Sequence, residues 1–235
     1  MNAQLLYQNG QLVEAIQALS AGLRDDPTAV RERTFLFELL CFAGEYDRAE
    51  KQLNLIAQSS REAEIGSLLY RSALHAERLR QEMFLAKAPV PGGVAPTAVS
   101  GTLNGDPFTS IADADPRIGA RLEIYAAGQY TWIPFAQLAS VSAESPQRLR
   151  DLLWIPTRVR TGPDYSDLEI GEVMVPALTP LAWQHPDPEV RLGRMTDWQE
   201  LPDGSEIPVG QKLLRVDDEL IPILEVRQLE ISSAT

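Results

Sequence analysis

The chain has 235 residues, enough for one or two domains, with the apolar and charged fractions of an ordinary globular protein. Its formal charge of −12 argues against nucleic acid or an anionic membrane as the main partner, because like charges repel. The excess is uneven, since the net charge is −2 over residues 1–88 and −10 over the remainder.

The first predicted elements are two helix pairs that follow one template 34 residues apart. This period is typical of the tetratricopeptide repeat, a helix-turn-helix unit that stacks into a scaffold and usually holds another protein. Gly fits the tight turn between the two helices, and Ala fits the point where they cross closely. The template residues are Leu6, Gly10, Leu12, Ala15 and Leu19, and then Leu40, Gly44, Tyr46, Ala49 and Leu53.

Five helices are therefore expected in the N-terminal part of the chain. The spacing of apolar residues predicts four short helices, over residues 4–8, 12–23, 31–42 and 46–57. A longer helix, capped by Ser59 or Ser60, is expected to run to about Lys87 and to cover the end of the repeat stack. The apolar stripe of this helix comprises Ile65, Leu68, Leu69, Ala76, Leu79 and Met83.

A partner-binding groove is predicted on the inner face of the repeats, which comes mainly from the first helix of each unit. Alignment of Gly44 with the turn of the repeat places Arg31, Thr34, Glu38, Cys41 and Phe42 on that face. Such a surface suits an amphipathic helix, and two repeats favour micromolar affinity over tighter binding. The alternative is that the long helix and the C-terminal part of the chain fill the groove and make it core.

The composition changes after residue 88. Residues 89–105 are rich in Pro and Gly and predict a linker between a helical domain, 1–88, and a second domain, 106–235. The second domain reads as a series of short strands, so the predicted fold is two-domain: all-α repeats, then an antiparallel β-rich α+β domain. Tight turns are expected at Asp203-Gly204 and Asp217-Asp218, and one helix over 118–127. The predicted strands are 129–135, 138–143, 152–160, 169–175, 189–197, 206–216 and 220–230.

Few residues suited to catalysis are present. His75 and His185 are the two histidines, and neither has a second one at metal-ligand spacing, so we expect no metal ion and no cofactor. Cys41, the one cysteine, is predicted to be a buried, inert thiol, which is compatible with a reducing cytoplasm. The N-terminus does not have the pattern of a secretory signal, and no apolar run is long enough to cross a bilayer.

Two closely spaced aspartates, Asp113 and Asp115, allow more than one interpretation. They resemble the start of a calcium loop, but Arg117 at position five and the missing Glu at position twelve contradict it. We predict instead that Asp115 caps a helix and that Asp113 bonds loop amides. An enzyme built on Asp113, Asp115, Arg117 and His185 is kept as an alternative. An adaptor that binds through an acidic surface at Asp217, Asp218 and Glu219 is another.

Several stretches of the chain together resemble the ImpE family, also called SciE or TagJ. The most specific are the aspartate block, with Asp113, Asp115 and Arg117, and the aromatic blocks that contain Trp132 and Trp154. The matching stretches are residues 35–40 with Gly44 and Tyr46, and then 111–119, 128–135, 149–154, 196–198 and 210–211.

The resemblance implies a cytoplasmic, non-enzymatic accessory protein of a bacterial type VI secretion system. It implies binding to the N-terminal helix of the small sheath subunit, and a role near the AAA+ ATPase that disassembles contracted sheaths. The chain departs from the family between the repeats and the aspartate block, where many members carry a longer helical stretch than residues 88–105. If that stretch helps to build the groove, partner binding is altered or lost here.

Overall fold

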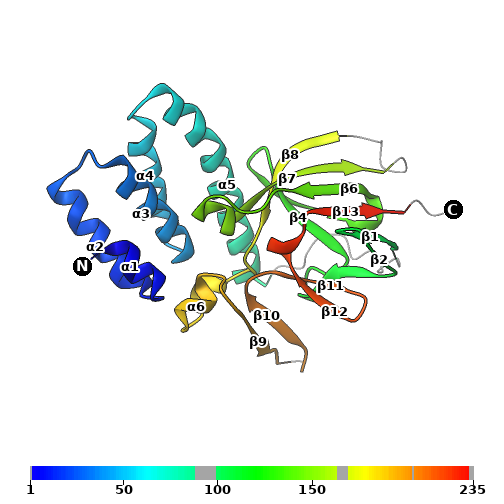
Figure 1. Cartoon of the computed structure of the whole chain (residues 1–235). Coiled ribbons are helices and arrows are strands. Elements are labelled where there is room, and N and C mark those ends of the chain that lie inside the picture. The colour runs from blue at the N-terminus through cyan, green and yellow to red at the C-terminus, as the bar shows by residue number, and fades with distance from the viewer. Residues whose placement is uncertain (1, 88–98, 163–168, 203, 233–235) are drawn as a thin grey trace.

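A helical N-terminal part and a β-rich C-terminal part pack against each other, as Figure 1 shows. The computed structural model describes residues 2–87, 99–162, 169–202 and 204–232. The arrangement confirms the predicted fold class of tetratricopeptide-like helices followed by an antiparallel β-rich domain.

The helices agree with the predicted repeat to within two residues at each end. Gly10 and Gly44, with φ of +74° and +70°, form the turns inside the two helix pairs. The Ser60 hydroxyl caps the long helix α5 by accepting a hydrogen bond of 3.1 Å from the amide of Ala63. The bounds are α1 Ala3–Gln8, α2 Leu12–Asp25, α3 Val30–Phe42, α4 Tyr46–Ala57 and α5 Arg61–Leu85.

Packing between the helices follows the template. Ala15 and Ala49 are fully buried where helices cross closely, and the template leucines are buried around them. Each buried leucine contributes roughly 1.5–3 kcal/mol to the hydrophobic stabilisation of the helical part.

Helix α5 differs from the prediction along its N-terminal half. The helix packs on α4 and so covers the end of the repeats as expected, but only part of its stripe is buried: Ala76 is buried, whereas Ile65, Leu68 and Leu69 are 62%, 55% and 49% exposed. The exposed part is not reached by the hairpin of residues 121–134, which packs on α5. The tip of this hairpin, at Gly128, extends along α5 only as far as Ser72.

The β-rich part is built around one large sheet. Its order is β2-β1-β13-β6-β7-β8-β4-β5, and within the described residues every pairing is antiparallel. A three-stranded sheet, β12-β11-β3, and a β9–β10 hairpin complete it. The strands are β1 Gly101–Leu103, β2 Asp106–Phe108, β3 Ile111–Asp113, β4 Arg121–Ala126, β5 Gln129–Pro134, β6 Leu138–Ala143, β7 Trp154–Thr161, β8 Glu169–Pro176, β9 Thr196–Glu200, β10 Glu206–Gly210, β11 Leu213–Val216, β12 Glu219–Pro222 and β13 Gln228–Ile231.

The strand predictions were confirmed in the middle of the domain, at β5 to β8, and failed around it. The helix expected over 118–127 is wrong, because most of this segment is β4, which pairs with β5. Both faces of β4 are buried: Leu122 and Ile124 face the sheet core, while Glu123 and Tyr125 contact α5. The segment also carries Ile118, Leu122 and Tyr125 at i, i+4 and i+7, a helical spacing that competes with the short alternation around Glu123.

The remaining differences concern element ends. Segment 189–197 is not one strand, because α6 (Pro188–Arg191), capped by Asp187, begins it. Segments 206–216 and 220–230 are each divided into two strands, the second of them by the short helical turn η5 (Ile223–Glu225). Strand β1 lies inside the predicted linker, of which 89–98 falls outside the described residues, as does Asp203. Asp217 does form a turn between β11 and β12, with φ of +51°.

The two parts share a hydrophobic core. The core of the helical part continues into Tyr125, Leu153, Trp154, Met174 and Leu192, which all belong to the C-terminal part. A separate core lies between the large sheet and the three-stranded sheet. The helical repeats are therefore packed on the β-rich part over a buried surface, and this places the candidate site.

Gly44 tests how tightly the two parts fit. A Cβ at Gly44 would lie 2.4 Å from the Trp183 ring, and the positive φ disfavours any side chain. We expect Gly44→Ala to lower the free energy of unfolding by about 2–4 kcal/mol in urea denaturation. Gly66→Ala is the control, because Gly66 is helical with open space around it, and it should stabilise by about 0.5–1 kcal/mol. Equal effects would contradict the close approach.

Candidate functional site

The inner surface of the repeats, formed by α1, α3 and α5, is the candidate site, and the C-terminal part contacts all three helices. The contact with α1 is made by Arg194, which follows α6. Its guanidinium donates hydrogen bonds to the carbonyls of Tyr7 (2.6 Å) and Gln8 (3.2 Å) and lies 4.8 Å from the Tyr7 ring centre. Carbonyls at a helix C-terminus have no partner inside the helix, so the arginine satisfies them.

The contact with α3 is made by the short helical turn η2 (Leu149–Leu152). Its Arg150 Nε lies 3.2 Å from the Glu38 carboxylate, and the guanidinium lies 4.8 Å from the Tyr70 ring centre. The Asp151 carboxylate fixes the turn by accepting the amides of Gln147 and Arg148, both at 2.9 Å. The inner surface at Glu38 is thus covered by a segment of the same chain.

The contact with α5 is a buried ionic network. Arg80, 1% exposed, donates from Nε and Nη2 to the two Glu123 oxygens at 2.8 and 2.9 Å, and from Nη2 to the Leu178 carbonyl. The Lys212 ammonium pairs with both Glu123 and Asp113. Burial alone would raise the pKa of Glu123, but the Arg80 and Lys212 charges outweigh it and hold that pKa at about 2.

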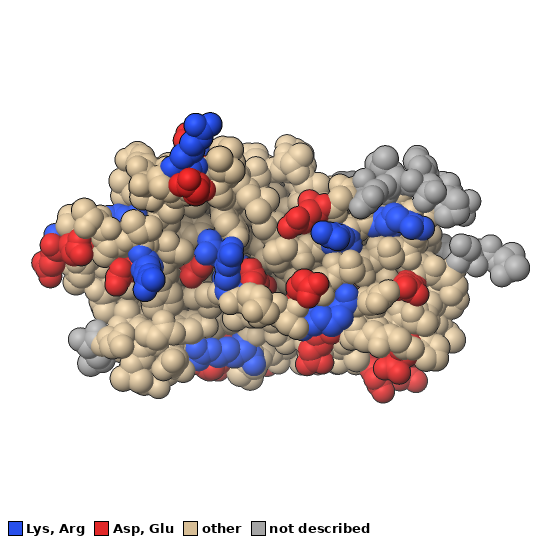
Figure 2. All heavy atoms as spheres, turned by 45° about the horizontal axis from the view of Figure 1, so that its top comes forward, with Lys and Arg blue, Asp and Glu red and all other residues tan. Residues whose placement is uncertain are grey.

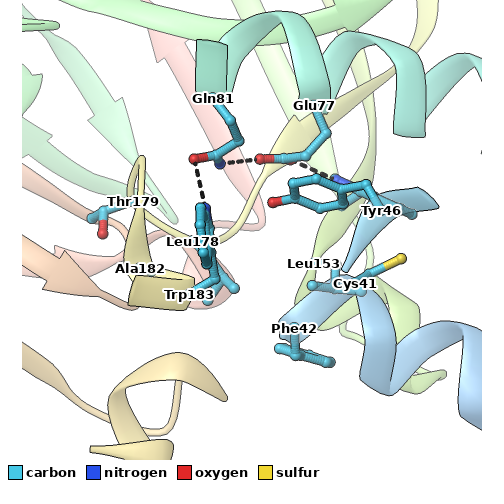
Figure 3. Close-up of a pocket in the computed structure, with 11 residues that line it drawn as sticks. Cys41, Phe42, Tyr46, Glu77, Gln81, Leu153, Leu178, Thr179, Ala182 and Trp183 are labelled. Atoms are coloured by element: carbon cyan, nitrogen blue, oxygen red, sulfur yellow. Dashed lines mark hydrogen bonds between the residues drawn. The ribbon is translucent and has the colours of Figure 1, made fainter. Parts of the chain in front are cut away.

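Glu77 extends this network along α5. Its carboxylate accepts the Tyr125 hydroxyl at 2.6 Å and the Trp154 indole N–H at 2.9 Å, and it also accepts the Gln81 amide. The Gln81 carbonyl oxygen in turn accepts the Trp183 indole N–H, as Figure 3 shows. A cavity of ≈ 20 Å³ between these side chains and α3 is large enough for one water molecule.

Comparison with known proteins adds a family to this geometry. Residues 105–230 match the family model described as "ImpE protein", and residues 3–71 match a tetratricopeptide repeat model. The chain belongs to the ImpE family. It is 30% identical, over 98% of its length, to the "Type VI secretion system accessory component TagJ" of Pseudomonas aeruginosa, covering 91% of that protein.

A solved structure has the same fold as this chain. The crystal structure of a Vibrio parahaemolyticus protein superposes with a TM-score of 0.86, over 99% of this chain and 98% of that one. Its sequence identity is 21%, so it supports the fold alone.

The ImpE motif residues gather at the α5 contact. Asp113, buried, pairs with Lys212 and accepts the Asp115 amide at 2.9 Å. Trp132 donates to the Tyr130 hydroxyl, which itself bonds Glu123. Trp154 bonds Glu77 on α5 directly, while Asp113 and Trp132 support Glu123, the partner of Arg80, through Lys212 and Tyr130.

Asp115 does not cap a helix, contrary to the prediction. Its fully buried carboxylate instead holds the loop by accepting the Arg117 amide at 3.0 Å and the Arg117 guanidinium at 2.6 Å. The guanidinium lies 4.9 Å from the ring centre of Phe84 on α5. This loop therefore adds a further contact between the parts.

An enzyme site at these residues finds little support. Asp113 and Asp115 are both committed to internal bonds, and the His185 ring lies 3.1 Å from Asp197, among different residues. Within the described ranges, no group of three or more His, Cys, Asp or Glu could hold a metal ion. No helix in the part of the chain that the structure describes is long and apolar enough to cross a membrane.

The predicted groove is only partly accessible. Glu38, Cys41 and Phe42 are buried, so the expectation that all five groove residues face one open groove is wrong. The physical reason is that η2 and the segment after it pack on the C-terminal end of α3, which is the alternative that the sequence allows. Arg31 is exposed and Thr34 half-buried, and their role in partner binding stays a prediction. Burial raises the pKa of the Cys41 thiol, in line with an inert cysteine.

Sequence reasoning missed the residues that matter most at α5. Only Glu123 carries a signal that could have revealed it, because it lies between Leu122 and Ile124. A charge in such a position is stable only with a partner. Glu77, Arg80 and Gln81 lie in a polar stretch, and Lys212 follows Gln211, so nothing in their neighbourhood marks them as buried. The missed residues are Glu77, Arg80, Gln81, Glu123 and Lys212.

The two arginines Arg80 and Arg78 on α5 form a matched pair for testing the network. Arg80→Met should lower the free energy of unfolding by about 3–5 kcal/mol, because Glu123 and Glu77 lose a buried cation. The Arg78 side chain is 27% exposed on Asp47 and Glu50, so Arg78→Met should cost less than about 1 kcal/mol. Urea denaturation of both variants measures these losses of unfolding free energy. A similar loss in both would contradict the special role of Arg80 in the buried network.

Glu38 provides a pH-dependent test of the α3 contact. Burial raises its pKa from 4.5 to about 7, and Asp151 raises it as well, against the attraction of Arg150 and Arg148. The neutral carboxyl is favoured in the folded state, so its contribution is complete below pH 4.5 and is lost as the pH rises through 7.

Relative to Glu38→Gln, which cannot titrate, wild type should therefore lose up to about 3 kcal/mol of unfolding free energy between pH 5 and pH 8. Urea denaturation of both proteins at the two pH values measures this. A constant difference between them would show that Glu38 has no raised pKa.

Proposed function

We propose that this chain is a non-enzymatic adaptor that binds the N-terminal helix of the small sheath subunit of a type VI secretion system in the cytoplasm. In this role it assists the AAA+ ATPase that handles contracted sheaths. The observation that carries the proposal is the similarity to a type VI secretion accessory component along almost the whole chain. That similarity supports the accessory role, and the sheath helix as partner comes from the family resemblance.

The repeat scaffold supports protein binding as the activity. Tetratricopeptide helices present an inner surface that suits an amphipathic helix, and here part of that surface, including Arg31, remains open. The C-terminal part takes the other portion, so the open surface is short. A short surface favours micromolar affinity.

The organisation of the motif residues favours an adaptor over an enzyme. Asp113 pairs with Lys212 and Asp115 with Arg117 inside the C-terminal part, and Arg117 also lies against Phe84 on α5. They are therefore engaged in structural contacts and are not poised around a substrate.

A binding titration tests the proposed function. We expect a fluorescent peptide of the small sheath subunit's N-terminal helix to bind the full chain with a Kd of about 1–50 µM. A scrambled peptide of equal composition is the control. The absence of binding at roughly 100 µM protein, or equal binding of both peptides, would contradict the proposal.

The same titration separates the groove from an acidic-surface adaptor. Asp217 accepts the amides of Thr109 and Ser110, so of the three acidic residues considered it has a structural role. Asp218 and Glu219 are exposed. Binding through them would weaken steeply with salt, and neutralising them would abolish it.

A further inference from the structure

An exposed apolar row lies on the N-terminal half of α5. Ile65, Leu68 and Leu69 are each about half exposed or more, at 62%, 55% and 49%. Their spacing of i, i+3 and i+4 places them together on one side of the helix. Single exposed apolar residues are ordinary, but several that adjoin one another mark an interaction surface.

The repeat period places this row on the inner surface. Adding 34 residues to Arg31 and Thr34 gives Ile65 and Leu68, so α5 begins a third unit and its row continues that of α3. Contacts between neighbouring first helices agree with this order. The Tyr7 and Phe35 ring centres are 5.7 Å apart, and those of Phe37 and Tyr70 are 6.4 Å apart.

The C-terminal part divides the inner surface into two halves. The β4–β5 hairpin runs along α5, with Glu123 on Arg80 and Tyr125 on Glu77, and ends where Gly128 approaches Ser72. The N-terminal halves of α3 and α5 lie beyond this end. We call this region the open half; it comprises Arg31, Thr34, Ile65, Leu68 and Leu69.

A cleft adjoins the open half. Leu69 and Tyr70 form one wall of a cleft of ≈ 750 Å³ whose other side is the outer face of β6, β7 and β8. Its polar lining carries both signs, because Arg158 on β7 stands opposite Glu172 on β8. The remaining charged groups that line it are Arg148, Arg227, Glu144 and Asp151.

The charge in the cleft beside the open half does not select a partner by sign, because three arginines and three carboxylates line it. On the face shown in Figure 2, Lys and Arg are interspersed with Asp and Glu and leave uncharged surface between them. Recognition at the open half must therefore rest on its apolar side chains.

We infer that the open half is the docking site for one amphipathic helix of a partner protein, with Ile65, Leu68 and Leu69 as the anchoring residues. The inference rests on the proposed function and deepens it by moving the contact from the C-terminal end of α3 to the N-terminal half of α5. The partner helix presents apolar residues at i, i+3 or i+4, and i+7.

The covered half of the same surface shows why the occupant is a helix. There the helical turn η2 is seated on the repeats, with Leu149 and Leu152 packed on the helical core and Arg150 on Glu38. The open half is continuous with this interface through Tyr70, whose ring contacts Arg150 and whose neighbour is Leu69. A helix seated there would extend an interface that the chain already uses internally.

Two single substitutions test this site. Leu68→Asp places a charge in the apolar row, and we expect it to weaken binding of the sheath-subunit peptide at least tenfold. Leu55→Asp is the matched control, because Leu55 on α4 is 45% exposed and lies outside the open half, so its affinity should stay within twofold. Circular dichroism and thermal melts verify that both variants fold like the wild type.

The possible results distinguish a wrong docking site from a wrong proposed function. If wild type binds the peptide and Leu68→Asp binds equally well, the site is overturned and the proposed function stands. If wild type does not bind, both are overturned. If light scattering shows that wild type is a dimer and that Leu68→Asp dissociates it, the inference is also overturned, because a second copy of the chain then covers the row.

Salt dependence is a further test of the apolar site. The affinity for the peptide should change by less than about threefold between 0.05 and 0.5 M salt, and a steep loss would contradict apolar recognition.

Discussion

The buried ionic network between α5 and β4 is the interaction on which the rest of this structure depends. Arg80 and Lys212 are removed from water together with Glu123 and Asp113, and such charges are tolerated only in close pairs. A shift of β4 along α5 would leave carboxylates unpaired in an apolar surrounding. The network therefore fixes the position of the β-rich part on the repeats, whatever its net contribution to stability.

This fixed position decides how much of the repeat scaffold stays accessible. Two arginines of the C-terminal part act in the same way. Arg194 bonds the Tyr7 carbonyl at the end of α1, and Arg150 lies against the Glu38 carboxylate on α3. The repeats thus bind their own C-terminal part as a tetratricopeptide array binds a ligand. The inner surface that stays exposed is the portion that the β4–β5 hairpin is too short to reach.

Prediction from sequence succeeded where structure depends on neighbouring residues. The helix pairs, the Gly44 turn and strands β5 to β8 follow from spacing within a few turns or along one strand. It failed at β4, because Ile118, Leu122 and Tyr125 have the spacing of a helix, and only packing against α5 shows that the segment is a strand with Glu123 buried on Arg80. It also failed at α5, where one apolar stripe is covered along only half of its length.

By itself, the sequence determined the repeat period, the order of helical and β-rich parts, and the blocks that mark the ImpE family. These are encoded in local spacing, because a turn needs its glycine and a helix its periodic apolar face. Only the tertiary structure decided that Trp154 bonds Glu77 on α5, that Asp113 and Trp132 lie in the network around Glu123, and that Phe42 is core while Leu68 is surface. Those outcomes depend on contacts between residues far apart in the chain, and no spacing within one segment records which partner will cover it.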